Sequence, residues 1–258
     1  MNLPFHIPRQ ALVGITAVIL CTLGFSAGGS RWLSIAPPPP TSAEVEEVAL
    51  QARWGQSTVA EWRLRGWAEA GHAVAQRELA ALLAATEETR GEALKWYTAA
   101  ASNHDVEAAY QAGEIYRAPI HQEQRNWARA QQYYLQAAQA GHAYAALALG
   151  RMIKNGEGAP ADAAAAVTWF ERAAERGNAQ AKFLLANAYA SGEGVAKDMD
   201  KYYQLLEESA EQHFPPAMHE LALIAEQRPV THGAHAESAA HLFKEAEEER
   251  RNRWQQIR

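Results

Sequence analysis

The stretch that decides the fold runs Gly141-His-Ala-Tyr-Ala-Ala-Leu-Ala-Leu-Gly150, and it returns as Gly177-Asn-Ala-Gln-Ala-Lys-Phe-Leu-Leu-Ala186. The two copies begin 36 residues apart, and a third copy begins after another 36 residues, at His213. More divergent copies begin at Gly71 and His104. Self-similarity at a period of this length is the signature of a repeat architecture, so the chain is predicted to be a short array of repeats.

A second pattern precedes the copies, in which two bulky residues are followed, after a gap of two, by two small ones. It occurs as Trp96-Tyr97 with Ala100-Ala101, as Tyr133-Tyr134 with Ala137-Ala138, and as Trp169-Phe170 with Ala173-Ala174. On a helix, this spacing places a large side chain and a small notch on the same face. Each pair of segments is therefore predicted to form a helical hairpin that buries its apolar face by stacking on neighbouring hairpins.

The combined pattern is Gly-x-x-x-Ala-x-x-x-Leu-Gly-x-x-Tyr, a glycine exit such as Gly156-Glu-Gly158, and Trp-Tyr-x-x-Ala-Ala. It resembles the SEL-one-like repeat, a relative of the tetratricopeptide repeat, over roughly residues 61–226. The resemblance implies an all-α, right-handed α-solenoid of about five helix-turn-helix repeats, used for protein–protein assembly and without catalytic residues. Asn103-His104 lacks the usual glycine, and residues 117–121 replace the glycine exit. Irregular helix pairing is expected at these two places.

The N-terminal segment has the pattern of a membrane anchor. Residues 1–10 form a flank with Arg9, and residues 11–29 carry no charge. As a helix these 19 residues would be about 28 Å long, close to the ~30 Å of a hydrocarbon core. We expect a transmembrane signal-anchor over residues 11–30, in the inner membrane with the repeats in the periplasm. The alternative is a cleaved signal peptide, which would leave a soluble periplasmic protein.

The rest of the chain divides by composition. Residues 31–41 contain four consecutive prolines and form a stiff spacer. Thr41 and Glu44 make a capping-box pattern, which predicts a helix that begins there and runs to about Arg53. The repeat domain is expected over residues 42–232, and a C-terminal capping helix with one apolar stripe over residues 233–258.

Composition and motifs argue against chemistry in this chain. The formal net charge of −6 does not favour nucleic acid, and the single Cys21 excludes a cysteine-built zinc site. No nucleophile, phosphate-loop or dinucleotide motif occurs, so no enzyme activity and no cofactor are predicted. His72 and His142 follow the repeat and are expected to be structural. His232, His235 and His241 lie close together in the sequence but lack the converging partners of a zinc site, so no metal is predicted.

The partner surface is predicted by analogy with the tetratricopeptide relative, in which the helix carrying the Leu-Gly pair lines the concave face. The residues of this chain at the equivalent inward-facing positions are predicted to form a binding groove. Its residues are Glu107, Tyr110, Glu114, Arg117, Tyr144, Leu147, Arg151, Lys154, Gln180, Phe183, Asn187, His219 and Glu226. The basic residues at its centre suit an acidic segment or a C-terminal carboxylate, although the same positions are also compatible with a merely solvated surface.

These patterns together favour a membrane-tethered, non-enzymatic scaffold that binds another envelope protein or a membrane complex. The alternative is an envelope protein associated with peptidoglycan or polysaccharide, for which exposed aromatic residues along the groove would be the favourable sign.

Overall fold

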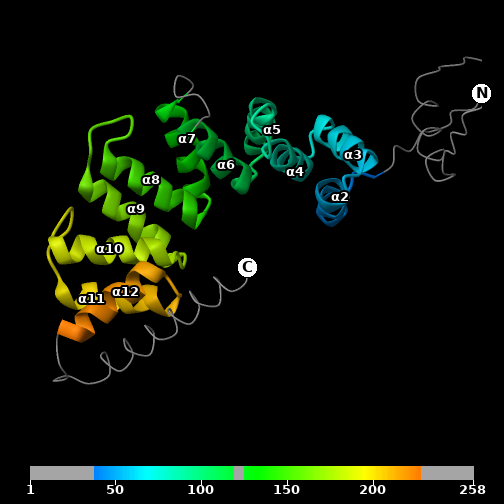
Figure 1. Ribbon diagram of the computed structural model, residues 1–258. Coiled ribbons are helices and arrows are strands. Elements are labelled where there is room, and N and C mark those ends of the chain that lie inside the picture. Colours follow the sequence, from blue (N-terminus) through cyan, green and yellow to red (C-terminus); the bar gives the residue numbers. More distant parts are fainter. Residues whose placement is uncertain (1–37, 119–124, 228–258) are drawn as a thin grey trace, which may run out of the picture. The chain divides into compact units, whose positions relative to one another are not determined.

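The computed structural model describes residues 38–118 and 125–227, and within these ranges it contains helices and no strand (Figure 1). The eleven helices are α2 (Ser42–Trp54), α3 (Thr58–Glu69), α4 (Ala73–Leu83), α5 (Arg90–Ser102), α6 (Val106–Arg117), α7 (Trp127–Gln139), α8 (Ala143–Asn155), α9 (Ala163–Glu175), α10 (Ala179–Ser191), α11 (Met199–Glu211) and α12 (Pro215–Gln227). From α3 onward each helix packs against the next one along the chain, and α2 packs against both α3 and α4. This is the predicted all-α solenoid of stacked hairpins.

The helices fall into two sets that alternate along the chain. We call α4, α6, α8, α10 and α12 the A helices, because each follows the Gly or His that begins a copy of the repeat, and α3, α5, α7, α9 and α11 the B helices. A small residue on an A helix lies against an aromatic ring of the next B helix, and we call this position the glycine notch. A Cβ atom on Gly113 of α6 would lie 2.7 Å from the ring of Tyr134 on α7, and a Cβ on Gly150 of α8 would lie 2.7 Å from the ring of Phe170 on α9. Each glycine therefore makes room for one buried aromatic ring.

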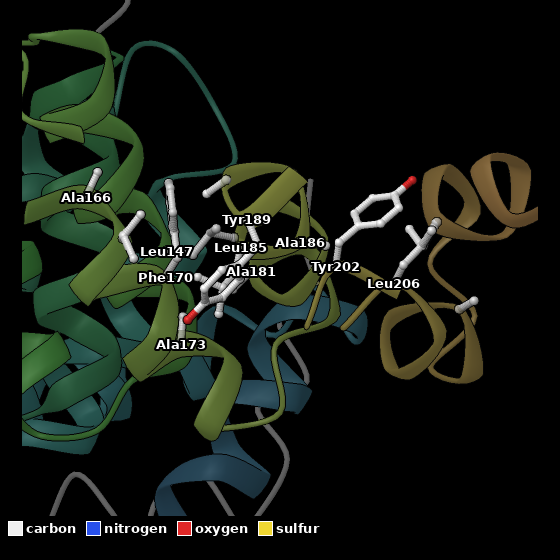
Figure 2. Close-up of a cluster of buried hydrophobic side chains, with 14 of the residues drawn as sticks. Leu147, Ala166, Phe170, Ala173, Ala181, Leu185, Ala186, Tyr189, Tyr202 and Leu206 are labelled. Carbon is white, nitrogen blue, oxygen red and sulfur yellow. The ribbon is translucent and has the colours of Figure 1, made fainter. Parts of the chain in front are cut away.

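The core runs without interruption along the stack. Its largest cluster joins Leu147 of α8, Phe170 of α9 and Leu206 of α11, as Figure 2 shows. The buried residues form three clusters, and the largest is the one nearest the C-terminal end of the array. Tyr133 packs against both the N-terminal and the middle cluster, and Trp169 packs against both the middle and the C-terminal cluster, so shared side chains connect all three. A continuous core made by stacking is what the repeat pattern predicted.

Side-chain caps begin most of the helices. Thr41 and Glu44 form the predicted capping box at the start of α2. His72 and His142 are also N-caps, since their Nδ1 atoms accept the backbone N–H of Ala75 at 3.4 Å and of Ala145 at 3.1 Å. Asp105 and Asn178 occupy the same position in other repeats. The structural interpretation of the two histidines is therefore confirmed; the Thr, Asp and Asn caps contribute about 1 kcal/mol each.

The prediction of irregular helix pairing at Asn103-His104 is wrong. His104 adopts φ 64°, the left-handed conformation that Gly141 adopts with φ 91°. The turn keeps its closing hydrogen bonds, because the N–H groups of His104 and Asp105 donate to Ala101 and Ala100 at 3.0 Å each. The turn therefore retains the repeat geometry, although a non-glycine residue in this conformation costs roughly 1–2 kcal/mol.

The exit from α6 differs from the glycine exits only in part. Ala118 has φ −127°, whereas Gly156 after α8 has φ 68°. The loop nevertheless closes in the same way: the N–H of Asn126 donates to the Tyr116 carbonyl at 3.0 Å, as the N–H of Asp162 donates to Ile153 at 3.2 Å. Residues 119–124 of this loop lie outside the described residues.

Three of the sequence predictions also fall outside the described residues. They are the transmembrane segment at 11–30, the capping helix at 233–258, and the His232, His235 and His241 group. In the part of the chain that the structure describes, no helix has both the length and the apolar character needed to cross a bilayer.

Candidate partner-binding surface

Ion pairs link successive repeats at the ends of the A helices. The Arg117 guanidinium, at the end of α6, donates from Nε and Nη2 to the Glu157 carboxylate at 2.8 and 3.0 Å. One repeat further, Lys154 Nζ at the end of α8 donates to Glu193 at 2.8 Å. The bases are 37 residues apart and the acids 36, so these are equivalent positions. We call the two pairs the inter-repeat clasps.

The clasps correct the prediction of a basic centre. The hydrogen bonds from Arg117 lower the pKa of Glu157, and the carboxylate in turn raises the pKa of Arg117. Both side chains of this pair are mostly buried, at 22% and 17% exposure. Arg117 and Lys154 are thus engaged in holding repeats together. Arg151 is left as the exposed base of the predicted centre, and it makes no ion pair within the described part of the chain.

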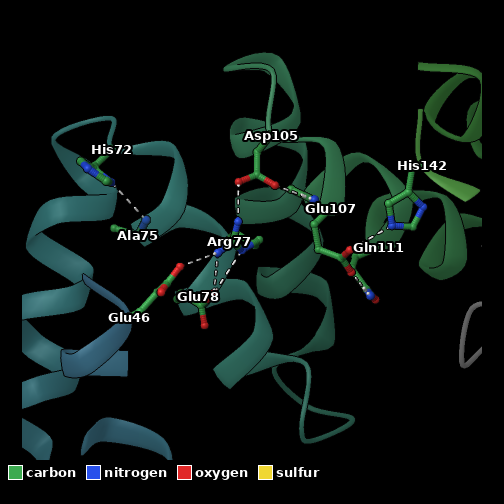
Figure 3. A network of polar contacts seen from close by, with 10 residues as sticks. Glu46, His72, Ala75, Arg77, Glu78, Asp105, Glu107, Gln111 and His142 are labelled. Carbon is green, nitrogen blue, oxygen red and sulfur yellow. Dashed lines mark hydrogen bonds and ion pairs between the residues drawn. The ribbon is translucent and has the colours of Figure 1, made fainter. Parts of the chain in front are cut away.

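An aromatic cluster spans the boundary between α6 and α8. The Tyr110 ring stacks on the His142 ring with centroids 4.7 Å apart, and the Tyr144 ring is tilted against His142 with centroids 6.2 Å apart. Because His142 Nδ1 accepts the cap hydrogen bond, its Nε2–H donates to Glu107, at 3.1 Å (Figure 3). Burial raises the pKa of Tyr110 to about 12, so its hydroxyl is neutral at physiological pH. Tyr144 is 61% exposed and presents its ring to solvent.

The other predicted groove residues divide between core and surface. Leu147 is 5% exposed and belongs to the core, so it is not available to a partner. Phe183 packs against the same core, with its ring 5.5 Å from Phe214. Glu114 accepts a 2.6 Å hydrogen bond from the Tyr134 hydroxyl. A partner could reach the remainder: Gln180 and Asn187, which are half-buried, and His219, which is exposed. The side chain of Glu226 lies outside the described residues.

A second polar network ties the N-terminal helices together. Arg77 of α4 pairs with Asp105, the N-cap of α6, at 3.0 Å, and with Glu78 at 3.0 Å (Figure 3). It also approaches Glu46 of α2 at 3.7 Å. One guanidinium therefore joins three helices, which is a structural role.

The sequence interpretation missed four exposed apolar side chains. They are Leu50 and Trp54 on α2 and Val59 and Trp62 on α3. The helical spacing carried the signal, because Leu50 and Trp54 lie outside the buried stripe formed by Val45, Val48, Ala49 and Ala52. Among the described residues no group of three or more His, Cys, Asp or Glu is arranged to hold a metal ion.

Comparison with known proteins supports the repeat assignment. The sequence model of the Sel1 repeat matches residues 90–105, 106–142, 143–178 and 179–214. A Sel1 repeat protein from Oxalobacter formigenes is similar in structure, with 26% identity, a TM-score of 0.65, and coverage of 80% of this chain and 85% of that one. A protective antigen of uropathogenic Escherichia coli with the same kind of fold has 24% identity and a TM-score of 0.67, over 81% of this chain and 46% of that one. No curated protein matches the sequence.

Proposed function

The chain carries Sel1 repeats over residues 90–214, and from that premise we propose that it is a membrane-tethered scaffold whose A-helix surface binds an envelope protein. Sel1 repeat proteins are generally scaffolds for protein–protein interaction, and their fold is typically non-catalytic.

The binding residues follow from exposure on α8. Tyr144 and Arg151 are seven residues apart, so they lie on one face of the helix, and both are exposed. Tyrosine and arginine are among the residues that contribute most to binding energy at protein interfaces. This pair is the observation that carries the proposal. The guanidinium suits a carboxylate of the partner, and the tyrosine ring suits an apolar side chain next to it.

The tether is supported by the sequence alone. The uncharged run at 11–29 has the length of a bilayer core, and Arg9 precedes it. We place the repeats in the periplasm and the anchor in the inner membrane; a cleaved signal peptide with a soluble periplasmic product is the alternative. N-terminal sequencing of the membrane fraction distinguishes these two forms.

The binding surface is tested by crosslinking from native membranes, followed by quantification of each captured protein. We compare the wild type with a Tyr144→Ala, Arg151→Glu variant. The matched control is Lys95→Glu, a charge reversal on the exposed surface of the B helix α5. A partner that uses the α8 surface should fall at least about tenfold with the first variant, which corresponds to ~1.4 kcal/mol, and remain with the control. Equal recovery of every protein with both variants contradicts the proposal.

A second candidate is binding of peptidoglycan or another envelope polysaccharide. The exposed Tyr144 ring next to the stacked Tyr110 and His142 rings favours it, because sugars stack on aromatic faces. Retention on murein sacculi that is lost with Tyr144→Ala but kept with Arg151→Glu would support this candidate over a protein partner.

A further inference from the structure

The α2–α3 hairpin exposes an unusual amount of apolar surface. Trp54 is 77% exposed, Trp62 64%, Val59 63% and Leu50 55%. These four are more than half of the seven large hydrophobic side chains that are exposed in the described part of the chain. The hairpin does not need them for folding, because α2 and α3 already bury Val45, Val48 and Leu64 against the array. Single exposed apolar side chains are ordinary on a protein surface, but four large ones on one helical hairpin point to a contact with another molecule.

Helix geometry groups the four residues. Leu50 and Trp54 are four residues apart on α2, and Val59 and Trp62 are three apart on α3, so each pair shares a helix face. Only the turn from Gly55 to Ser57 separates Trp54 from α3. The two pairs therefore lie on either side of one turn. We call these four residues the hairpin apolar group.

Chain length limits what can lie next to this group. Ser42, the first residue of α2, lies 13 positions after Gly29, the last residue of the apolar run at 11–29, and 13 steps of chain span at most roughly 45 Å. Helix α2 itself is about 20 Å long. The hairpin is thus the part of the repeat array nearest along the chain to the proposed anchor. A surface held at such a distance meets a high effective concentration of its target.

Charge and residue type identify the target. Together α2 and α3 carry five acids and three arginines, so attraction to an anionic surface is not the driving force. Tryptophan, by contrast, is enriched at the membrane–water interface, where its apolar ring and its N–H group are both accommodated. We infer that the hairpin apolar group rests on the lipid surface of the membrane that holds the N-terminal segment. This inference rests on the proposed tether.

The test places an environment-sensitive fluorophore on the hairpin of the full chain in phosphatidylcholine vesicles. Cys21→Ala removes the native thiol, and Val59→Cys provides the labelling site. The matched control site is Met199→Cys on α11, a large hydrophobic that is also exposed, at 39%. A shallow lipid nitroxide should quench the probe at 59 at least about twofold more than at 199, and iodide in the water should quench it less. High salt and anionic lipid should change neither result, because the contact is apolar.

A variant then tests the residues themselves. Trp54→Ser with Trp62→Ser should restore iodide quenching at position 59 to the level at 199, while the far-UV circular dichroism stays unchanged, since both rings lie outside the core. The same quenching with and without the two tryptophans would overturn the inference.

Flotation of the vesicles separates this inference from the tether. If the chain does not float with the vesicles, the tether and the inference both fail. If it floats but the probes at 59 and 199 are equally open to iodide, the tether stands and the inference fails. If the probe at 59 is shielded from both quenchers, and more so at a higher protein-to-lipid ratio, protein covers the hairpin and the lipid contact is overturned.

Discussion

Gly150→Ala should destabilise the array, although alanine is the better helix former. A Cβ at this position would lie 2.7 Å from Phe170 Cε1, 2.8 Å from Cδ1 and 3.2 Å from the Ala166 carbonyl oxygen. Carbon atoms in contact prefer about 3.5–4.0 Å, so the ring must move by roughly 0.8 Å or more. Phe170 is 2% exposed, and the residues around it are buried too. Overpacking of this kind costs about 1–3 kcal/mol, whereas the gain in helix propensity is about 0.8–1.0 kcal/mol.

We therefore expect Gly150→Ala to lower the free energy of unfolding by up to about 2 kcal/mol. In a protein of this size each kcal/mol lowers the Tm by roughly 2–4 °C. A second substitution that should relieve the crowding is already present in the neighbouring repeat. At the equivalent positions of the next hairpin stand Ala186 and Leu206, which share one core cluster (Figure 2). Phe170→Leu added to Gly150→Ala reproduces that combination, and the smaller side chain leaves room for the new methyl group.

The assay is a double-mutant cycle measured by urea denaturation and far-UV circular dichroism. Phe170→Leu alone removes buried volume and should cost stability by itself. The cost of Gly150→Ala should shrink in the leucine background, which gives a coupling energy of about 1 kcal/mol or more. Additive costs, or a Gly150→Ala variant at least as stable as the wild type, would refute the notch as the reason for glycine at this position.

Three further predictions concern stability. His104→Gly should raise the Tm by a few degrees in a thermal scan, because it removes roughly 1 kcal/mol of left-handed strain at φ 64°; an unchanged Tm would contradict this reading of the turn. Glu157→Gln should lower the free energy of unfolding by about 1 kcal/mol at pH 7, and by less below the ordinary glutamate pKa of 4.5. Because Arg117 lowers the pKa of Glu157, the clasp is fully effective above pH 4.5 and is lost as the pH falls through the lowered pKa. Denaturation at several pH values checks this, and a cost that does not change with pH would oppose it. Burial raises the pKa of Tyr97 from 10 to about 12, so its contribution to stability should be lost between these pH values, and Tyr97→Phe should flatten that alkaline loss in a pH titration of the Tm.

Much of the fold could be predicted, because the repeat spacing encodes backbone packing directly. The period located the hairpins, and of each bulky pair that the pattern placed on an apolar face, the second member, such as Tyr134 and Phe170, is buried in the core. Turn conformations were harder to predict. A missing glycine at His104 indicated irregularity, but the surrounding hydrogen bonds hold the residue in the left-handed region. The conformational preference of a single residue does not show how strongly the surrounding repeat can hold a non-glycine residue in the left-handed conformation.

The candidate site could be predicted only in part, because it depends on contacts between residues about 40 positions apart. Arg117 and Lys154 were predicted as groove residues, but their partners, Glu157 and Glu193, lie in the glycine-rich loops of the next repeat and were not predicted. Leu147 follows the pattern of an inward groove position, yet its neighbours cover it. Transferring positions from the tetratricopeptide repeat cannot predict whether a residue is buried by its neighbours, because burial depends on the size of side chains in other repeats.

The contacts of α8 explain why a binding site there would be effective with few exposed residues. His142 at its start donates to Glu107 of the preceding repeat, Lys154 at its end donates to Glu193 of the following one, and Glu157 just beyond it accepts from Arg117. Seven of the thirteen residues of α8 are buried. A helix fixed at both ends loses little further freedom when a partner binds to it, so more of the contact energy remains as affinity. If this reasoning holds, Glu193→Gln should weaken partner binding through Tyr144 although it touches no partner, and Glu193→Asp, which keeps the charge, should weaken it less. Equal binding by the wild type and both variants would show that the clasp does not support the surface.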